Sequence, residues 1–182
     1  VLRRRYRPMK KTVRILIAGH DTMIGRALAT ELREQGYAAV FPGEQGFPDW
    51  ADRTAVRHLF ETVRPDHVFC AAGKSGGIGL NRTHPADLMF DNVKSILAVI
   101  EAARDYGTAK LLYLASSCCY PRECPQPIPP GALMTGPLEP TNEAYATAKL
   151  AGILLCQACR QEYGSNFIAA IPATPFGPGD HF

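Results

Sequence analysis

Residues 12–25 read TVRILIAGHDTMIG, and this stretch decides the fold. Its first half, from Thr12 to Ala18, is a short aliphatic and β-branched run, which is typical of a buried strand. Gly19 and Gly25 enclose the loop that follows. Apolar residues then recur at helical spacing until a glycine ends the helix, at Ile24, Leu28, Leu32 and Gly36. A strand, a glycine loop and a helix in this order predict a dinucleotide site, because the helix N-terminus would face the pyrophosphate.

The rest of the chain alternates between strand and helix patterns. Further strands are predicted at residues 38–41, 67–72, 111–115 and 167–171, and further helices at 52–63, 86–106 and 143–163. Residues 73–79 and the proline-rich stretch 124–140 are expected to be loops. This alternation predicts an α/β fold, a Rossmann-like doubly wound parallel sheet. We expect the strand order 3-2-1-4-5, with ligands bound beyond the carboxyl ends of strands 1 and 4.

The 182 residues fit a single domain at residues 12–182, preceded by a basic tail at residues 1–11 that we expect to be disordered. Much of the formal net charge of +3 comes from this tail, through Arg3, Arg4, Arg5, Arg7, Lys10 and Lys11. The remainder is close to neutral, which argues against a nucleic-acid partner. Because no apolar run approaches about 18 residues, we expect no membrane span.

The cysteines of the chain are Cys70, Cys118, Cys119, Cys124, Cys156 and Cys159. Since no secretion signal precedes them, they predict reduced thiols and a cytoplasmic protein. Cys156 and Cys159 have a metal-like spacing, but they lie within a helical pattern and no second pair completes four ligands. We therefore expect them to pack in the core, and we predict no metal site.

Tyr145 and Lys149 lie four residues apart in the predicted helix 143–163 and therefore share a face. A cation close to a phenol lowers its pKa from the usual value of about 10, so Tyr145 could exchange a proton with a substrate oxygen near neutral pH. Ser116 follows the fourth strand and would hold that oxygen. The same spacing also suits an ordinary exposed helix pair. Because the Gly19 loop and Ser116 open into one crevice, we predict a redox enzyme whose cofactor carries the hydride chemistry.

Several motifs resemble a known family. They are IAGH at 17–20, AA at 71–72 with Lys74 and GGI at 76–78, PAD at 85–87, SSC at 116–118 with YP at 120–121, and LEPTNE at 138–143. With these, residues 13–182 resemble the extended short-chain dehydrogenase/reductase superfamily and, within it, the GDP-L-fucose synthase family. The resemblance implies the N-terminal part of an epimerase/reductase that uses NADP or NAD and acts on a GDP-linked 4-keto-6-deoxy sugar. It also implies a homodimer formed through helices 86–106 and 143–163.

The resemblance implies roles for individual residues. The reductase residues of the family match Ser116, Tyr145 and Lys149, and its acid/base cysteine of epimerisation matches Cys118, for which a small packing residue is the alternative. We expect Asp52 or its neighbours near the adenine. The full set of expected cofactor-binding residues is Gly19, Thr22, Met23, Ile24, Gly25, Asp52, Ala71, Ala72, Tyr145, Lys149 and Pro172.

Three features depart from the family pattern. Thr22 replaces the middle glycine of the nucleotide loop, so its backbone is expected further from the pyrophosphate. Glu44 and Gln45 stand where the family has an arginine near the 2′-phosphate, and a carboxylate there favours NAD over NADP. The chain stops at Phe182, where the family continues, so we expect a substrate domain and its partner histidine to be largely absent.

Two other functions stay open. The chain could be a non-catalytic nucleotide-binding fragment, or another sugar-nucleotide epimerase/reductase with the same scaffold. Ser116, Tyr145 and Lys149 in register argue against neutral drift of a fragment. The missing histidine and sugar domain argue against turnover by these 182 residues without further protein.

Overall fold

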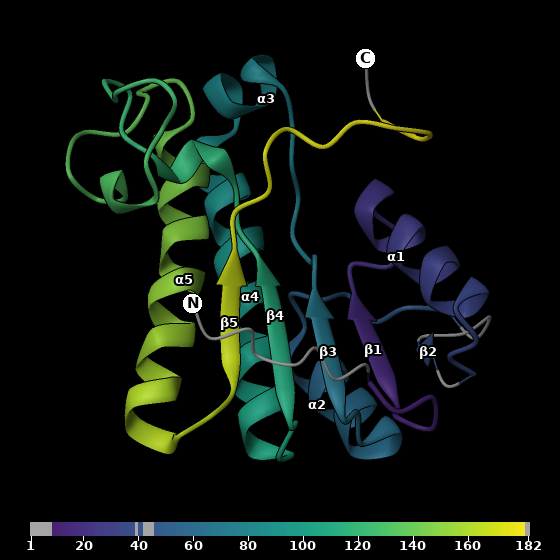
Figure 1. The fold of residues 1–182 in the computed structure, drawn as a ribbon. Helices are drawn as coiled ribbons and strands as arrows, with labels where there is room; N and C mark the ends of the chain where they lie inside the picture. The colour runs from purple at the N-terminus through teal and green to yellow at the C-terminus, as the bar shows by residue number, and fades with distance from the viewer. Residues whose placement is uncertain (1–8, 39, 42–45, 181–182) are drawn as a thin grey trace.

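The computed structural model describes residues 9–38, 40–41 and 46–180. Within them, five parallel strands form one sheet in the order β2-β1-β3-β4-β5 (Figure 1). The strands are β1 (Ile15–Ala18), β2 (Val40–Phe41), β3 (His67–Cys70), β4 (Lys110–Leu114) and β5 (Phe167–Ala170). The helices are α1 (Met23–Glu34), α2 (Arg53–Val63), α3 (Ile78–Thr83), α4 (Pro85–Asp105) and α5 (Glu143–Tyr163), with short 3-10 turns η1 (Ser117–Cys119) and η2 (Pro130–Ala132). The predicted α/β class and parallel sheet are confirmed.

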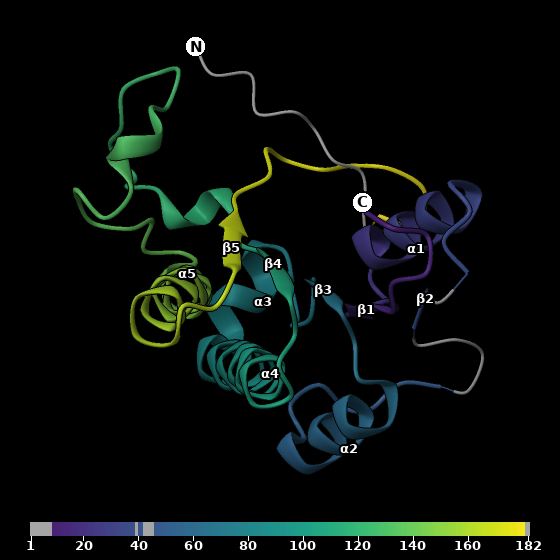
Figure 2. The same ribbon diagram turned by 60° about the horizontal axis from the view of Figure 1, so that its bottom comes forward.

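Helices cover both faces of the sheet. Figure 2 shows α2, α4 and α5 on one side and α1 on the other. Strand β1 serves both layers, since Leu16 and Ala18 belong to the core under α2, α4 and α5, whereas Ile15 and Ile17 belong to the core under α1. All four residues of β1 are 0% exposed, which explains why the strand reads as a continuous apolar run rather than an alternating one.

The predicted strand order 3-2-1-4-5 is wrong. Strand β3 pairs with β1 and lies between β1 and β4, so the point where the order of the strands switches sides lies between β1 and β3. Contacts ahead of the strands fix this pairing: the Arg14 amide donates to Asp66 Oδ2 at 2.8 Å, and the Asp66 and His67 amides donate to the Arg14 carbonyl at 2.9 and 3.1 Å. The pattern of alternating elements does not specify which strand the third one pairs with, and the prediction placed it beside strand 2 instead of beside strand 1.

Element boundaries differ from the prediction by a few residues, except for α5, whose predicted range is confirmed. The glycine-bearing loop predicted at 73–79 instead leads into α3. This six-residue helix contains Gly79, a weak helix former, and is held by Asn81, whose Nδ2 donates to the carbonyls of Gly76 and Gly77 at 2.8 and 3.2 Å.

The end of the predicted basic tail contacts the fold. The Tyr37 hydroxyl donates to the Met9 carbonyl at 3.3 Å, and Lys11 Nζ lies 3.8 Å from the centroid of the Tyr37 ring. Residues 1–8 lie outside the described residues, so the boundary at residue 11 stays a prediction. In the part of the chain that is described, no helix is both long and apolar enough to cross a membrane.

Candidate active site

The glycine loop between β1 and α1 brings three backbone segments into close contact. Gly19 has a φ of +82°, and a Cβ built there would lie 2.5 Å from the Ala71 carbonyl carbon at the end of β3. A Cβ on Gly25 would lie 2.0 Å from the Gly19 carbonyl oxygen. The first turn of α1 therefore packs directly on the loop, at the point where β1 and β3 end.

Thr22 has a definite structural role at this loop. It is the N-cap of α1, where its Oγ1 accepts from the Gly25 amide at 3.0 Å and donates to the Gly19 carbonyl at 2.6 Å. The first amide groups of a helix have no acceptor within the helix. Because Thr22 satisfies Gly25, the amides of Met23 and Ile24 are the ones that an anion at this helix end could bind.

A cavity of about 450 Å³ is lined by both the loop and two of the predicted catalytic residues, Tyr145 and Lys149. Its lining includes Asp21, Thr22, Met23, Ile24, Arg26, Ala71, Gly73, Lys74, Ser75, Leu80, Leu114, Ala115, Tyr145, Lys149, Gly179 and Asp180. A second cavity of about 210 Å³ shares Asp21, Thr22, Gly73 and Lys74 with the first and continues to Asp49, Trp50 and Ala51. Together they form an elongated space along the carboxyl ends of β1, β3 and β4.

Tyr145 and Lys149 lie on the same face of α5, as predicted, and both line the 450 Å³ cavity. Lys149 is only 6% exposed, and its Nζ donates to the Leu114 carbonyl at 3.4 Å and lies 5.8 Å from the Tyr145 ring centroid. The hydroxyl of Tyr113, buried in β4, donates to the Lys149 carbonyl at 3.2 Å. The sheet thus fixes the part of α5 that carries both side chains.

Burial dominates the electrostatics of this pair. It raises the pKa of Tyr145, and a hydrogen bond with the Ser116 hydroxyl opposes that rise. Burial also lowers the pKa of Lys149. The sequence predicted that Lys149 would lower the Tyr145 pKa. In this structure the opposing influence comes from Ser116 instead, because the Lys149 ammonium is directed at the Leu114 carbonyl.

The cysteines fall into two groups. Cys118 is half-buried in η1, and the side-chain amide nitrogen of Asn142 lies 3.2 Å from its Sγ. Cys156 and Cys159 are 1% and 4% exposed, so their predicted packing in the core is confirmed. Burial raises the pKa of the Cys156 thiol to about 12, which keeps it protonated. Cys118 is therefore the cysteine that combines access with a polar partner near Tyr145, a predicted catalytic residue.

Some expected cofactor residues do not line either cavity. Asp52 is the N-cap of α2, where its Oδ1 accepts from the amides of Thr54 and Ala55 at 2.8 and 3.1 Å. Its neighbours Asp49, Trp50 and Ala51 line the smaller cavity instead. Ala72 is fully buried, and Pro172 lies beyond β5 and lines neither cavity. Glu44 and Gln45, on which the choice between NAD and NADP was based, lie outside the described residues.

Two basic side chains that were not predicted to belong to the site also line the 450 Å³ cavity. They are Arg26 and Lys74, beside the expected Lys149. Lys74 Nζ lies 2.6 Å from Asp91 Oδ2, and the hydrogen bond to this carboxylate raises the Lys74 pKa. Arg26 Nη1 donates to the Asp21 carbonyl at 2.6 Å. The sequence held a signal for each residue. Lys74 belongs to one of the motifs that resemble the family, and Arg26 directly follows Gly25 of the glycine loop.

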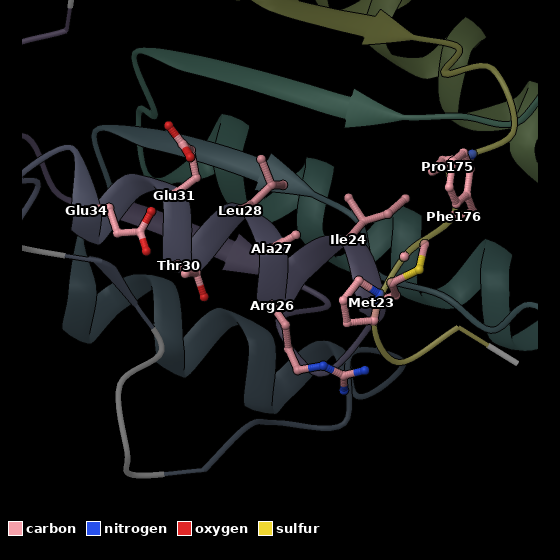
Figure 3. A pocket seen from close by; sticks show the side chains of 12 residues that line it. Met23, Ile24, Arg26, Ala27, Leu28, Thr30, Glu31, Glu34, Pro175 and Phe176 are labelled. Carbon is pink, nitrogen blue, oxygen red and sulfur yellow. The ribbon is translucent and has the colours of Figure 1, made fainter.

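A larger cavity of about 760 Å³ lies on the outer side of α1 (Figure 3). There Pro175 and Phe176 of the C-terminal segment lie beside Met23 and Ile24 of the first turn. None of the predicted catalytic residues lines it. We therefore place the candidate active site in the two smaller cavities.

The residues present fit a nicotinamide dinucleotide. The Gly19 loop leaves no room for a Cβ, an α1 N-terminus and basic side chains offer a site for phosphates, and the smaller cavity extends away from Tyr145 towards Trp50. The two cavities adjoin at the residues that they share. Such a shape suits an elongated ligand with its reactive end at Tyr145.

Comparison with known proteins agrees with this geometry. The chain is 45% identical over 169 residues to GDP-L-fucose synthase of Sinorhizobium fredii (strain NBRC 101917 / NGR234), covering 93% of this chain and 54% of the relative. It is 42% identical over 174 residues to putative GDP-L-fucose synthase 2 of Arabidopsis thaliana, covering 96% and 53%. The chain thus spans about half the length of the curated relatives it matches.

A solved structure and a family model extend the comparison. The GDP-L-fucose synthetase of Naegleria fowleri bound to NADP is 27% identical and superposes with a TM-score of 0.82, covering 94% of this chain and 53% of that one. The model of the NAD dependent epimerase/dehydratase family matches residues 15–182. Since that match includes the glycine loop, both cavities and the Tyr145–Lys149 pair, the chain belongs to the NAD dependent epimerase/dehydratase family.

Proposed function

We propose that this chain forms the cofactor-binding and catalytic half of an enzyme that epimerises and then reduces a GDP-linked 4-keto-6-deoxy sugar. The observation that carries the proposal is the shared cavity, in which the dinucleotide loop meets Tyr145 and Lys149 beside Ser116 and Cys118. The similarity to GDP-L-fucose synthases supports the choice of substrate.

In the reduction, a nicotinamide cofactor, NADP or NAD, would supply the hydride from its reduced form, NADPH or NADH. Tyr145 gives its phenolic proton to the C4 oxygen of the sugar. Because burial raises its pKa, Tyr145 stays protonated at neutral pH, which a proton donor requires. Ser116 shares a hydrogen bond with Tyr145 and is placed to hold the same oxygen, while Lys149 adds a basic group at the cavity.

In the epimerisation, Cys118 exchanges ring protons with the sugar. The 4-keto group acidifies the neighbouring C–H bond, and a thiolate is a base of suitable strength to take that proton. A second acid/base group on the opposite face of the ring would come from protein that follows residue 182 in the relatives. We expect no measurable turnover from residues 1–182, because loss of substrate positioning can remove about 7–11 kcal/mol of barrier lowering.

Cofactor binding tests the proposal directly. Trp50 is the single tryptophan of the chain and lines the smaller cavity, so its emission should be quenched when NADH or NADPH is added to residues 1–182. If Glu44 faces the ribose, NADH should bind at least as tightly as NADPH, and Glu44→Arg should reverse this preference. Absence of binding by either nucleotide at millimolar concentration would contradict the proposed function.

The proposal includes a homodimer in the cytoplasm. Phe90 and Leu97 of α4 are 63% and 47% exposed and lie two helical turns apart on one face, and Leu154 of the adjacent α5 is 43% exposed. Exposed apolar groups on neighbouring helices favour burial against a second copy. The cysteines, all within the described residues, are free thiols, as a reducing compartment maintains them.

Light scattering tests the dimer. We expect a mass twice that of the 19.8 kDa chain, and the double variant Phe90→Lys/Leu97→Lys should be monomeric, because two buried charges oppose association. Ile128→Lys, an exposed apolar position in the proline-rich loop, is the matched control and should remain dimeric. A monomeric wild-type chain at high concentration would refute this part of the proposal.

A further inference from the structure

Asn142 has an unusual side-chain position for its place in the helix. It is the N-cap of α5, where an Asn side chain ordinarily accepts a hydrogen bond from an amide of the first turn. Its side chain makes no such bond. Its Nδ2 instead donates to Cys118 Sγ at 3.2 Å, across 24 residues of sequence. The side chain of Asn142 is therefore directed at the thiol rather than at its own helix.

We propose that Asn142 is a positioning residue for Cys118, holding the sulfur in place and stabilising its thiolate form. This inference rests on the proposed function, in which Cys118 moves ring protons. A thiolate can only accept hydrogen bonds, so the Nδ2–H group is the partner that it needs. Hydrogen bonds to an ionised partner are also stronger than those between neutral groups.

The oxygen of the same amide is the acceptor for the protonated form of the thiol. Asn142 Oδ1 is buried and has no hydrogen-bond partner among the described residues. When Cys118 acts as the base, its S–H bond forms as the C–H bond of the sugar breaks, and the electron pair passes to the 4-keto oxygen. The amide then turns by 180°, so that Oδ1 accepts from the new S–H group. When the proton returns to carbon, the S–H bond breaks and the amide turns back. Asn142 therefore donates a hydrogen bond to the thiolate and accepts one from the thiol.

The other groups around the sulfur do not replace this donor. The Ser116 hydroxyl accepts from the Cys118 backbone amide at 3.3 Å, not from the thiol. Cys118 contributes electrostatically to the pKa shifts of Cys119, from the same turn, and of Tyr145, from α5. Burial raises the pKa of both groups, so each is neutral near pH 7, and neither a thiol nor a phenol can supply positive charge to a thiolate.

Alkylation kinetics test the inference on residues 1–182 without substrate or cofactor. Iodoacetamide reacts with thiolates, and peptide mapping by mass spectrometry reports Cys118 and the half-buried Cys124 in the same sample. Asn142→Ser keeps a good N-cap residue but cannot reach the sulfur. We expect its Cys118 alkylation at neutral pH to fall about tenfold, because the hydrogen bond from Nδ2 to the sulfur is lost. Asn142→Asp, which sets a carboxylate against the sulfur, should react more slowly still, and Cys124 should not change.

The outcomes separate this inference from the proposed function. An unchanged rate of Cys118 alkylation in Asn142→Ser overturns the inference. An equal fall in the alkylation rate of Cys124, or a loss of cooperative unfolding, also overturns the inference. Either result would show that the substitution only loosens α5. Failure to bind NADH or NADPH would instead contradict the proposed function and would leave the alkylation result unaffected.

Discussion

Changing Tyr145 to Phe is expected to lower the rate of 4-keto reduction about 10²–10⁴-fold, the usual contribution of a general acid, while ring-proton exchange continues. The phenyl ring keeps the packing of Tyr145 but removes the proton that the C4 oxygen takes up. Cys118→Ala should have the opposite effect, because exchange needs the thiol and reduction needs Tyr145. The two variants therefore separate the reduction from the ring-proton exchange at one active site.

The measurement uses a chimera in which residues 1–182 are followed by the C-terminal half of the Sinorhizobium fredii relative, since this chain spans 54% of that protein. A 4-keto-6-deoxy GDP-sugar is incubated in heavy water with reduced cofactor. Deuterium incorporation reports exchange, and cofactor absorbance reports reduction. Reduction by Tyr145→Phe at the wild-type rate would show that the role assigned to Tyr145 is wrong. A wild-type chimera that binds cofactor but accepts only a different nucleotide sugar would favour another enzyme of the same family.

Gly25→Ala is expected to destabilise the fold by about 1–3 kcal/mol, the usual cost of overpacking, and to weaken cofactor binding at least about tenfold. The new Cβ would lie 2.0 Å from the Gly19 carbonyl oxygen and 2.6 Å from the His20 Cα. Both are backbone atoms, so no side chain can rotate away. The loop or the helix must move, and either movement displaces the α1 amides from the cavity.

Gly79→Ala is the matched control, because it is also a glycine within a helix. Among the described residues, nothing lies within 4 Å of a Cβ at this position. The ordinary helical preference for Ala should therefore apply and stabilise the chain by about 0.5–1 kcal/mol. Urea unfolding followed by Trp50 fluorescence measures both variants. If Gly25→Ala were as stable as Gly79→Ala, the close packing of the loop against α1 could not be what positions the site.

Local features of the chain were predictable from the sequence. The range 143–163 of α5 follows from its helical pattern, and Tyr145 and Lys149 share a face because four residues make about one helical turn. The strand, glycine loop and helix at residues 15–34 follow from apolar runs and two glycines. In each case the deciding interactions join residues within a few positions of each other.

Tertiary contacts decided the rest. The place of β3 beside β1 depends on hydrogen bonds between Arg14 and Asp66, which are 52 residues apart, and no local pattern specifies such a pairing. The pKa of Tyr145 depends on burial by the surrounding fold and on a hydrogen bond with Ser116, which lies outside its helix. The bond from Asn142 to Cys118 joins α5 to η1, and only the packing of that helix on the sheet brings the two side chains together. Local periodicity therefore predicted the elements and the shared face of Tyr145 and Lys149, whereas the tertiary structure set the protonation and the partners of the candidate residues.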